Sequence, residues 1–504
     1  MSPTVIDDTV KAVLTSRVYE VAMESPLERA IHLSSTAGCH AYLKREDLQS
    51  VHSFKLRGAY NKIAQLTEAE KAKGVIAASA GNHAQGVALA AQKLGLSALI
   101  VMPRTTPGIK IEAVKSYGAE VELAGDSYSD AAEYCKQRVR ETGRTYVHPY
   151  DDPLVIAGQG TIGREIIEQL PEVTHIFVPV GGGGLIAGIA SYVKVLRPDI
   201  KIISVEPEDS NAMQASVRAG KRVTLPHVGI FADGVAVKQV GERTFETALS
   251  KVDDFITVTT DQLCAAIKTI FEDTRGIVEP AGALAAAGMA HYGLPKDAHA
   301  VAICSGANTT FERLQQIAER TLLGSGSEVM FAVTMPEKPG ALRCFCTEVV
   351  GGHNISEFGY RLSGRGVAHV LVGVSVRNDA DKQSFMRKMV RAGYAHTDLS
   401  SDDIAKEHVR HMVGGAAAIA NEHMYEITFP ERPGALSDFL TAVGNEWNIS
   451  LFHYRSAASD WGRVLIGFEA ADRSALERNL KNTGFEFASA NANAAIRTFV
   501  ADKK

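Results

Sequence analysis

The chain has 504 residues, of which 45% are hydrophobic and 22% are charged. This length suggests roughly two to four domains, and the composition is that of a soluble globular protein and excludes a largely disordered chain. A net charge of -5 without a long basic run argues against nucleic acid or an anionic membrane as the main partner. The apolar runs are too short for a membrane-spanning helix, and six scattered cysteines favour reduced thiols in the cytoplasm and no metal site.

The first 320 or so residues alternate short apolar runs with helical patterns. The runs that we expect to be strands are 74–78, 98–102, 120–123, 175–180, 202–205 and 300–303. Such alternation predicts an α/β fold in which helices cover both faces of a parallel sheet. Because ligands bind at the carboxyl ends of the strands in these sheets, the polar motifs that follow the strands are the first candidates for a site.

Lys55 lies in the segment Ser-Phe-Lys-Leu-Arg-Gly, between aromatic and aliphatic neighbours. Desolvation lowers the pKa of a lysine, and a neutral amine is what imine formation with an aldehyde requires. A surface lysine whose methylene stem lies along the protein is the structural alternative.

The segment Ser-Ala-Gly-Asn-His, residues 79–83, follows the expected strand 74–78 directly. Small residues with exposed N–H groups at the start of a helix suit a carboxylate ligand. An ordinary helix cap at Ser79 or Asn82 would explain the same residues. Ser305 follows the expected strand 300–303 in the same way, so that its hydroxyl could reach the same cleft.

Four consecutive glycines, Gly181 to Gly184, stand between the expected strand 175–180 and a helical pattern. A turn without side chains at a helix start leaves N–H groups that can bind a phosphate. Gly182-x-Gly184-x-x-Ala187 together with Glu206 also fits a dinucleotide fingerprint, so a nicotinamide dehydrogenase remains an alternative. We interpret a second match, which begins at Gly158, as the glycine-rich start of a helix.

The C-terminal part contains an internal repeat. Pro-Gly-Ala-Leu begins at 339 and again at 433, and both Asn-Ile-Ser and Tyr-Arg recur with the same offset of 94. Each copy has a strand pattern (330–335, 424–429), a Pro-Gly turn, a helical pattern and two more strands. This order predicts two small ferredoxin-like α+β domains. We therefore expect a first domain over 1–322, a linker over 323–328, and small domains over 329–400 and 423–494.

These motifs together resemble the fold-type-II pyridoxal-phosphate enzymes, which are similar to the tryptophan synthase β subunit, and the repeated copies resemble ACT domains. Their order along nearly the whole chain is similar to that of the biosynthetic threonine dehydratase family. The resemblance makes residues 1–322 the catalytic domain and implies pyridoxal 5′-phosphate as the cofactor. It also implies that Lys55 forms the imine with the cofactor and acts as the catalytic base, that Asn82 contacts the ring hydroxyl and that Ser305 contacts the pyridine nitrogen.

Further site residues follow from the same resemblance. It places the cofactor phosphate at Gly181, Gly182, Gly183, Gly184 and Leu185, and the substrate carboxylate at Ser79, Gly81, Asn82 and His83. Glu279 comes near the cleft by the same resemblance, although a solvated carboxylate at a helix start explains that residue equally well.

The activity that the resemblance implies is conversion of L-threonine to 2-oxobutanoate and ammonia in a homotetramer, as the first step of isoleucine biosynthesis. Isoleucine would inhibit and valine would oppose it through the C-terminal domains. The candidate effector residues occupy equivalent repeat positions, where they could equally be core residues: Leu342, Tyr360, Leu436 and Tyr454. The alternatives are a serine dehydratase or another fold-type-II lyase, the dehydrogenase, and a binding module joined to a degenerate enzyme.

Overall fold

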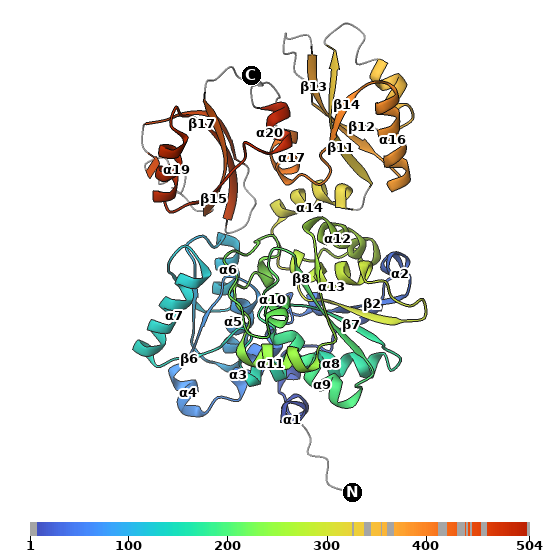
Figure 1. Ribbon diagram of the computed structural model, residues 1–504. Coiled ribbons are helices and arrows are strands. Elements are labelled where there is room, and N and C mark those ends of the chain that lie inside the picture. The colour runs from blue at the N-terminus through green and yellow to red at the C-terminus, as the bar shows by residue number, and fades with distance from the viewer. Residues whose placement is uncertain are drawn as a thin grey trace. The chain divides into compact units, whose positions relative to one another are not determined.

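The computed structural model describes residues 8–324, 327–336, 344–353, 355–359, 367–411, 421–430, 439, 442–443, 446–454 and 461–500. The chain forms two compact units, Met1–Phe311 and Glu312–Lys504 (Figure 1). Helix α14 (Phe311–Gly324) therefore falls almost wholly in the second unit, whereas the sequence boundary at 322 placed it in the first. A helical period shows that a segment is a helix but does not show which unit it joins.

The first unit contains two sheets, where the strand and helix alternation suggested one. The larger sheet is parallel except for its antiparallel edge strand β1, and its strands in spatial order are β1 (Leu27–Arg29), β2 (His40–Arg45), β10 (His299–Cys304), β7 (His175–Pro179), β8 (Lys201–Pro207) and β9 (Asp254–Val258). The smaller sheet is parallel throughout, in the order β5 (Glu120–Leu123), β4 (Ala98–Met102), β3 (Val75–Ala78) and β6 (Thr145–Tyr146).

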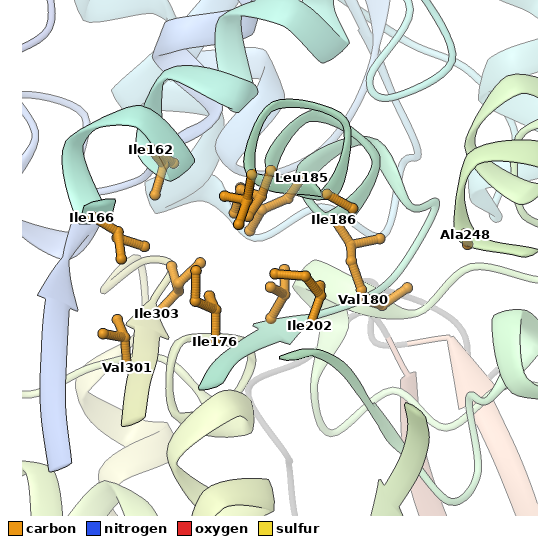
Figure 2. Close-up of a cluster of buried hydrophobic side chains, with 14 of the residues drawn as sticks. Ile162, Ile166, Ile176, Val180, Leu185, Ile186, Ile202, Ala248, Val301 and Ile303 are labelled. Atoms are coloured by element: carbon orange, nitrogen blue, oxygen red, sulfur yellow. The ribbon is translucent and has the colours of Figure 1, made fainter. Parts of the chain in front are cut away.

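Helices cover both faces of the larger sheet, because its strands are apolar on both sides. One face packs against α8 (Pro153–Gln169), α9 (Gly184–Leu196) and α11 (Glu242–Lys251). Figure 2 shows this core, with Leu185 and Ile186 of α9 and Ala248 of α11 beside strand residues such as Ile176. On the opposite face Phe177 meets the ring of Tyr292, which follows α13 (Pro280–His291), and α12 (Thr260–Thr274) packs against α13.

The smaller sheet is also covered on both faces. Alternate strand residues such as Val75 and Ala77 pack against α3 (Lys55–Ala64), α5 (Asn82–Leu94) and α6 (Gly108–Ser116). Ile76 and Ala78 face α7 (Tyr128–Thr142). The remaining α-helices of the first unit are α1 (Asp8–Leu14), α2 (Ile31–Ala37), α4 (Glu68–Lys73) and α10 (Ala212–Ala219).

The second unit contains two four-stranded antiparallel sheets, one for each copy of the repeat. The first has the order β12 (Ile355–Gly359), β13 (Val367–Ser375), β11 (Glu328–Pro336) and β14 (Ala395–Asp398). The second has the order β16 (Asn448–Tyr454), β17 (Trp461–Glu469), β15 (Glu422–Pro430) and β18 (Glu486–Ser489). Both follow the ferredoxin-like strand order, in which the first and third strands lie in the middle. Their described helices are the π-helix Cys346–Val350, α16 (Asp379–Arg391), α17 (Asp403–Glu407), α19 (Arg473–Asn482) and α20 (Ala494–Phe499).

The two copies share a core within the second unit. Met330 and Leu371 of the first sheet lie in one hydrophobic cluster with Met424 and Leu465 of the second. The offset of 94 residues holds for the starts of β11 and β15 and of α16 and α19, but α19 has 10 residues where α16 has 13. The copies are therefore similar in their sheets and different in this helix.

Two negative findings apply to the part of the chain that the structure describes. Within it, no helix is both long enough and apolar enough to cross a membrane. No group of three or more His, Cys, Asp or Glu side chains in the same residues could hold a metal ion.

Candidate active site

Lys55 is the first residue of α3, and its amine lies deep among protein atoms although the side chain as a whole is only partly buried. Nζ donates a hydrogen bond of 3.1 Å to the carbonyl oxygen of Pro149 and lies 5.3 Å from the centre of the Phe54 ring. Burial lowers the pKa of Lys55 to about 8, while the negative charge of Glu279 acts in the opposite direction. A far larger share of this amine is therefore neutral near pH 7 than for an ordinary lysine, as a nucleophile requires.

Arg57, two residues further along α3, anchors this helix in the protein interior. Its fully buried guanidinium forms ion pairs with Glu46, at 2.7 Å, and with Glu165. Lys44, also fully buried, pairs with Glu165 at 2.6 Å. Two cations and two carboxylates thus join α3 to β2 and α8. This cluster fixes the position of the turn of helix that carries Lys55.

Asn82 is held between two polar side chains at the start of α5. Its Nδ2 donates to Oε1 of Glu279 at 2.6 Å, and its Oδ1 accepts from Nδ2 of Asn308 at 2.7 Å. The preceding residue, Gly81, is the helix cap and has no side chain that could satisfy the first N–H groups of the helix. Ser79 Oγ accepts the Gly81 N–H at 3.3 Å, outside the helix. The first turn of α5 therefore keeps N–H groups for a ligand, since they have no acceptor within the helix.

The imidazole of His83 bonds to the main chain of Val147 and is not a group that would bind the substrate carboxylate. It is buried, and its Nε2 donates to the carbonyl oxygen of Val147 at 2.8 Å. Burial lowers the pKa of His83 to about 3, so the ring is neutral at physiological pH. Among the residues that the structure describes, its Nδ1 has no hydrogen-bond partner. What His83 can offer a substrate carboxylate is consequently its main-chain N–H.

The four glycines form the turn between β7 and α9. Gly183 has a φ of 93°, which a residue with a side chain rarely adopts. A Cβ at Gly182 would lie 2.3 Å from the ring of Tyr150, and one at Gly181 would lie 2.9 Å from Cα of Val235. The protein's own packing therefore requires glycine here. The turn also leaves the first N–H groups of α9 without acceptors in the helix, at the end where the helix dipole favours an anion.

Ser305 follows the last residue of β10 and is buried. Its Oγ donates to the carbonyl oxygen of Ala281 at 3.1 Å, and its own carbonyl accepts the N–H of Phe54 at 3.2 Å. The next residue, Gly306, forms a β-bridge with Ser53. Ser305 therefore lies beside the segment that leads into Lys55, although 250 residues separate the two in the chain.

Glu279 is a site residue whose environment the sequence did not reveal. It stands at the cap position of α13 and is only 3% exposed, so it is not the solvated carboxylate considered above. It accepts from Asn82, and its charge reaches Lys55. The one local signal in the sequence is the position of Glu279 directly before Pro280. It indicates the start of a helix but does not indicate that the Glu279 carboxylate is buried.

Glu206, which favoured a dinucleotide site, and the second glycine motif at Gly158 both serve the protein's own packing. Glu206 is fully buried and accepts the N–H groups of Met213 and Gln214 at 2.8 and 2.7 Å, so it satisfies the start of α10. Burial raises its pKa to about 8. Gly158 lies inside α8, beyond its first turn, and a Cβ there would lie 2.7 Å from Cα of Gly58. The interpretation of this motif as a helix start was wrong, because the motif lies inside α8. Its glycines allow close packing between helices.

The site as a whole fits pyridoxal phosphate. An amine of lowered pKa suits the aldehyde, a helix start with glycines suits the phosphate, a hydroxyl suits the ring nitrogen, and an oriented amide suits the ring hydroxyl. The cradle at Gly181–Gly184 and the enclosed Lys55 amine are the observations on which this fit rests.

Comparison with known proteins decides the family. The family model for the pyridoxal-phosphate dependent enzymes matches residues 20–306. The model for the C-terminal regulatory domain of threonine dehydratase matches twice, at 319–409 and 413–500. The biosynthetic L-threonine dehydratase of Burkholderia multivorans is 49% identical, over 98% of this chain and 99% of that protein. The chain belongs to the biosynthetic L-threonine dehydratase family.

A second curated relative and two solved structures are also similar to this chain. The biosynthetic L-threonine dehydratase of Escherichia coli is 46% identical over 98% of this chain and 97% of that protein. Among solved structures, processed threonine deaminase isoform 2 of Solanum lycopersicum has a TM-score of 0.61 and 48% identity, over 62% of this chain and 92% of that one. Maize serine racemase has a TM-score of 0.59 and 33% identity, over 63% of this chain and 98% of that one. The dehydratase family thus has the pyridoxal-phosphate fold expected from the motifs, with two regulatory copies added.

The effector residues expected in the regulatory copies stay predictions. Leu342, Tyr360 and Leu436 lie outside the residues that the structure describes. Tyr454 is the last residue of β16, and its side chain lies outside the described part as well.

Proposed function

We propose that the chain converts L-threonine into 2-oxobutanoate and ammonia by eliminating the β-hydroxyl group, as the first step of isoleucine biosynthesis. The observation that carries this proposal is the enclosed Lys55 amine, whose pKa burial lowers to about 8. Phe54, its neighbour, donates its N–H to the carbonyl oxygen of Ser305. Glu279 accepts a hydrogen bond from Asn82, and its negative charge acts on the Lys55 amine. These contacts of Ser305, Glu279 and Asn82 support a common role with Lys55.

Each group has a part in this reaction. Pyridoxal phosphate, when bound, supplies an electron sink for negative charge at the substrate α-carbon. Lys55 Nζ would hold the cofactor at rest, and the same amine, free when the substrate amino group has taken its place, would accept the α-proton. The N–H groups of the loop from Ser79 to His83, with Gly81 and Asn82 at its centre, bind the substrate carboxylate at the start of α5. Gly181 to Leu185 bind the phosphate in the same manner at the start of α9.

Asn82 and Ser305 orient the cofactor ring. Asn82 Nδ2 uses one hydrogen for Glu279 and keeps the second for the ring hydroxyl. The Ser305 hydroxyl, which donates to Ala281 in this structure, can rotate toward the ring nitrogen. A neutral serine does not hold a proton on that nitrogen as an aspartate would. The resulting weaker electron withdrawal favours elimination over transamination.

L-serine is the second substrate that we consider. A pocket that distinguishes threonine from serine by one methyl group gains only about 1–3 kcal/mol, so we expect both to react and threonine to react faster. The similarity to maize serine racemase supports a site for small hydroxy amino acids, but it covers 63% of this chain. The two matches to the regulatory domain of threonine dehydratase favour the biosynthetic activity.

We also propose that the second unit senses isoleucine as an inhibitor and valine as its opponent. The domains that would do so are 329–400 and 423–494. Each effector would act by binding one of two conformations more tightly than the other. The matches of both copies to a regulatory-domain family support effector binding. Leu342, Tyr360, Leu436 and Tyr454 remain the candidate pocket residues.

A homotetramer in the cytoplasm completes the proposal. Exposed apolar side chains support contacts between subunits: Ile31 of α2 is 72% exposed and Phe271 of α12 is 41% exposed. These two helices lie together, because the N–H groups of His32 and Leu33 donate to Asp273. Cys39, Cys135 and Cys304 are free, buried thiols, which suits a reducing compartment.

One set of assays tests the proposed activity. The purified chain with pyridoxal phosphate should absorb near roughly 410 nm, release 2-oxobutanoate from L-threonine, and release it more slowly when isoleucine is added. Lys55→Ala should abolish both the absorption and the product, whereas Lys93→Ala, at an exposed position of α5, should change neither. A colourless wild-type protein, or an active Lys55→Ala variant, would overturn the proposal.

A further inference from the structure

Two donors from α11 hold the carbonyl oxygen of Gly182 in the glycine turn. Thr244 Oγ1 donates to it at 2.7 Å, and the N–H of Gly241 donates to it at 3.2 Å. Thr244 is fully buried, and the same residue lies 2.8 Å from where a Cβ of Gly183 would be. The hydroxyl and the glycine turn are therefore in direct contact, without space for water between them.

The direction of the Gly182 carbonyl sets the direction of the next N–H group. In a trans peptide the C=O of one residue and the N–H of the following residue lie in one plane and point in opposite directions. Because the carbonyl of Gly182 points at α11, the N–H of Gly183 points away from α11. The helical geometry of α9 already directs the N–H groups of its first turn, from Gly184 onward. The N–H of Gly183, the cap residue, is the group whose direction depends on Thr244.

Helix α11 is itself rigidly placed. The two carboxylate oxygens of Asp151 accept the N–H groups of Glu242 and Arg243 at 2.9 and 3.1 Å and so satisfy the start of the helix. Further along, Ala248 is buried in the same hydrophobic cluster as Leu185 and Ile186 of α9, at its edge in Figure 2. Asp151 follows Pro149, whose carbonyl accepts the Lys55 amine, by two residues. A continuous path of hydrogen bonds and short chain segments therefore joins Lys55 to the glycine turn.

We propose that Thr244 is a positioning residue for the cofactor phosphate, which it serves by holding the Gly182–Gly183 peptide with its N–H toward the phosphate. The inference rests on the proposed function, because it takes Gly181 to Leu185 as the phosphate site. Without the hydroxyl, a single donor, the longer bond from Gly241, remains on the Gly182 carbonyl. Glycine has few steric restrictions on φ and ψ, so this peptide can then rotate.

The test compares two ligands in full-length protein from which the cofactor has been removed. Thr244→Val keeps the shape of the side chain and removes the donor, and Thr244→Ser keeps the donor. We expect Thr244→Val to bind pyridoxal phosphate about tenfold more weakly, the effect of losing one hydrogen bond, and to bind pyridoxal, which lacks the phosphate, with unchanged affinity. Thr244→Ser should bind both ligands as wild type does. The ³¹P resonance of the holoprotein should shift in Thr244→Val alone.

A control and a second variant separate this role from a general loss of structure. Thr247→Val removes an exposed hydroxyl from the same helix, where it donates to the Arg243 carbonyl, and should change nothing. Thr244→Ala should show the same selective loss as Thr244→Val. Equal weakening for both ligands, or unchanged affinity for pyridoxal phosphate, would overturn the role of Thr244. A wild-type protein that binds pyridoxal as tightly as pyridoxal phosphate would instead overturn the phosphate site of the proposed function.

Discussion

Asn308 fixes the orientation of Asn82. The Nδ2 of Asn308 donates to Oδ1 of Asn82 at 2.7 Å and also to the carbonyl oxygen of Val51 at 2.8 Å. On its other side Asn82 donates to Glu279 at 2.6 Å. An amide with a donor at its oxygen and a carboxylate at its nitrogen cannot turn over without losing both bonds. Asn82 is therefore presented to the site in a single orientation.

Replacing Asn308 should disturb the cofactor ring. Asn308→Asp places an acceptor against Oδ1 of Asn82, which favours the reversed amide, whereas Asn308→Ala removes the donor and leaves the bond to Glu279 to hold the amide. We expect the absorption maximum of the bound cofactor to move in both variants, with cofactor affinity falling about tenfold and further in Asn308→Asp. Absorption spectra and cofactor titration measure both effects. An unchanged maximum in Asn308→Asp would show that Asn82 is held by Glu279 alone.

The pH dependence of cofactor uptake should depend on Glu279. Burial lowers the pKa of Lys55 to about 8, and the charge of Glu279 raises it against that effect. Because only the neutral amine attacks an aldehyde, the rate of cofactor uptake by cofactor-free protein should rise with pH through about 8. Glu279→Gln removes the charge and keeps an acceptor for Asn82, so the midpoint should move to lower pH. A midpoint that stays in place or rises would contradict this account of the Lys55 environment.

Arg57 should be among the most costly residues to replace. Arg57→Met leaves Glu46 and Glu165 buried with Lys44 as the remaining cation of the cluster, and breaking a buried ion pair in this way costs about 3–5 kcal/mol. Arg197→Met removes a surface pair with Asp199 that water screens, so we expect a far smaller loss of stability. Urea unfolding followed by circular dichroism compares the two variants. Similar midpoints for both would mean that the cluster contributes little to stability.

Removal of the residues that follow α14 should separate catalysis from regulation. The first unit has sheets and hydrophobic cores of its own, so we expect it to fold without the second. A chain that ends after Gly324 should therefore keep 2-oxobutanoate formation within a few-fold of the full-length rate and lose the response to isoleucine. Initial rates at increasing isoleucine concentration measure both. Inhibition that persists in the shortened chain would place the effector site in the first unit.

The parts of the fold that local sequence encodes were predicted well. The strands 98–102 and 120–123 are β4 and β5 with the same bounds, because short apolar runs between helical patterns leave few choices. The presence of two sheets could not be predicted, since a strand has the same local pattern in either one. The same holds for Glu206, where the fingerprint spacing was met although the carboxylate serves α10.

The candidate site divides in a similar way. Lys55 and the glycine turn stand in distinctive local motifs, and their roles stay predictions that the lowered pKa of Lys55 and the glycine-requiring packing support. Pro149, Thr244 and Asn308 act through contacts with residues about 60 to 260 positions away in the chain. Such contacts leave no period or spacing in the sequence. They become visible only when the packing of the helices is known.

The shorter helix in the second copy has a consequence for how the two modules can respond to small molecules. The N-caps Asn378 and Asp472 are 94 residues apart, but the buried residues Phe385 and Leu476 are 91 apart, so the missing turn is the first one. In the first copy that turn carries Asp381, which bonds to His353 at 3.3 Å. At the position 94 residues beyond His353 the second copy has Trp447, which packs on its own core. Duplication has thus yielded two unequal regulatory modules, and a small molecule that fits one of them need not fit the other.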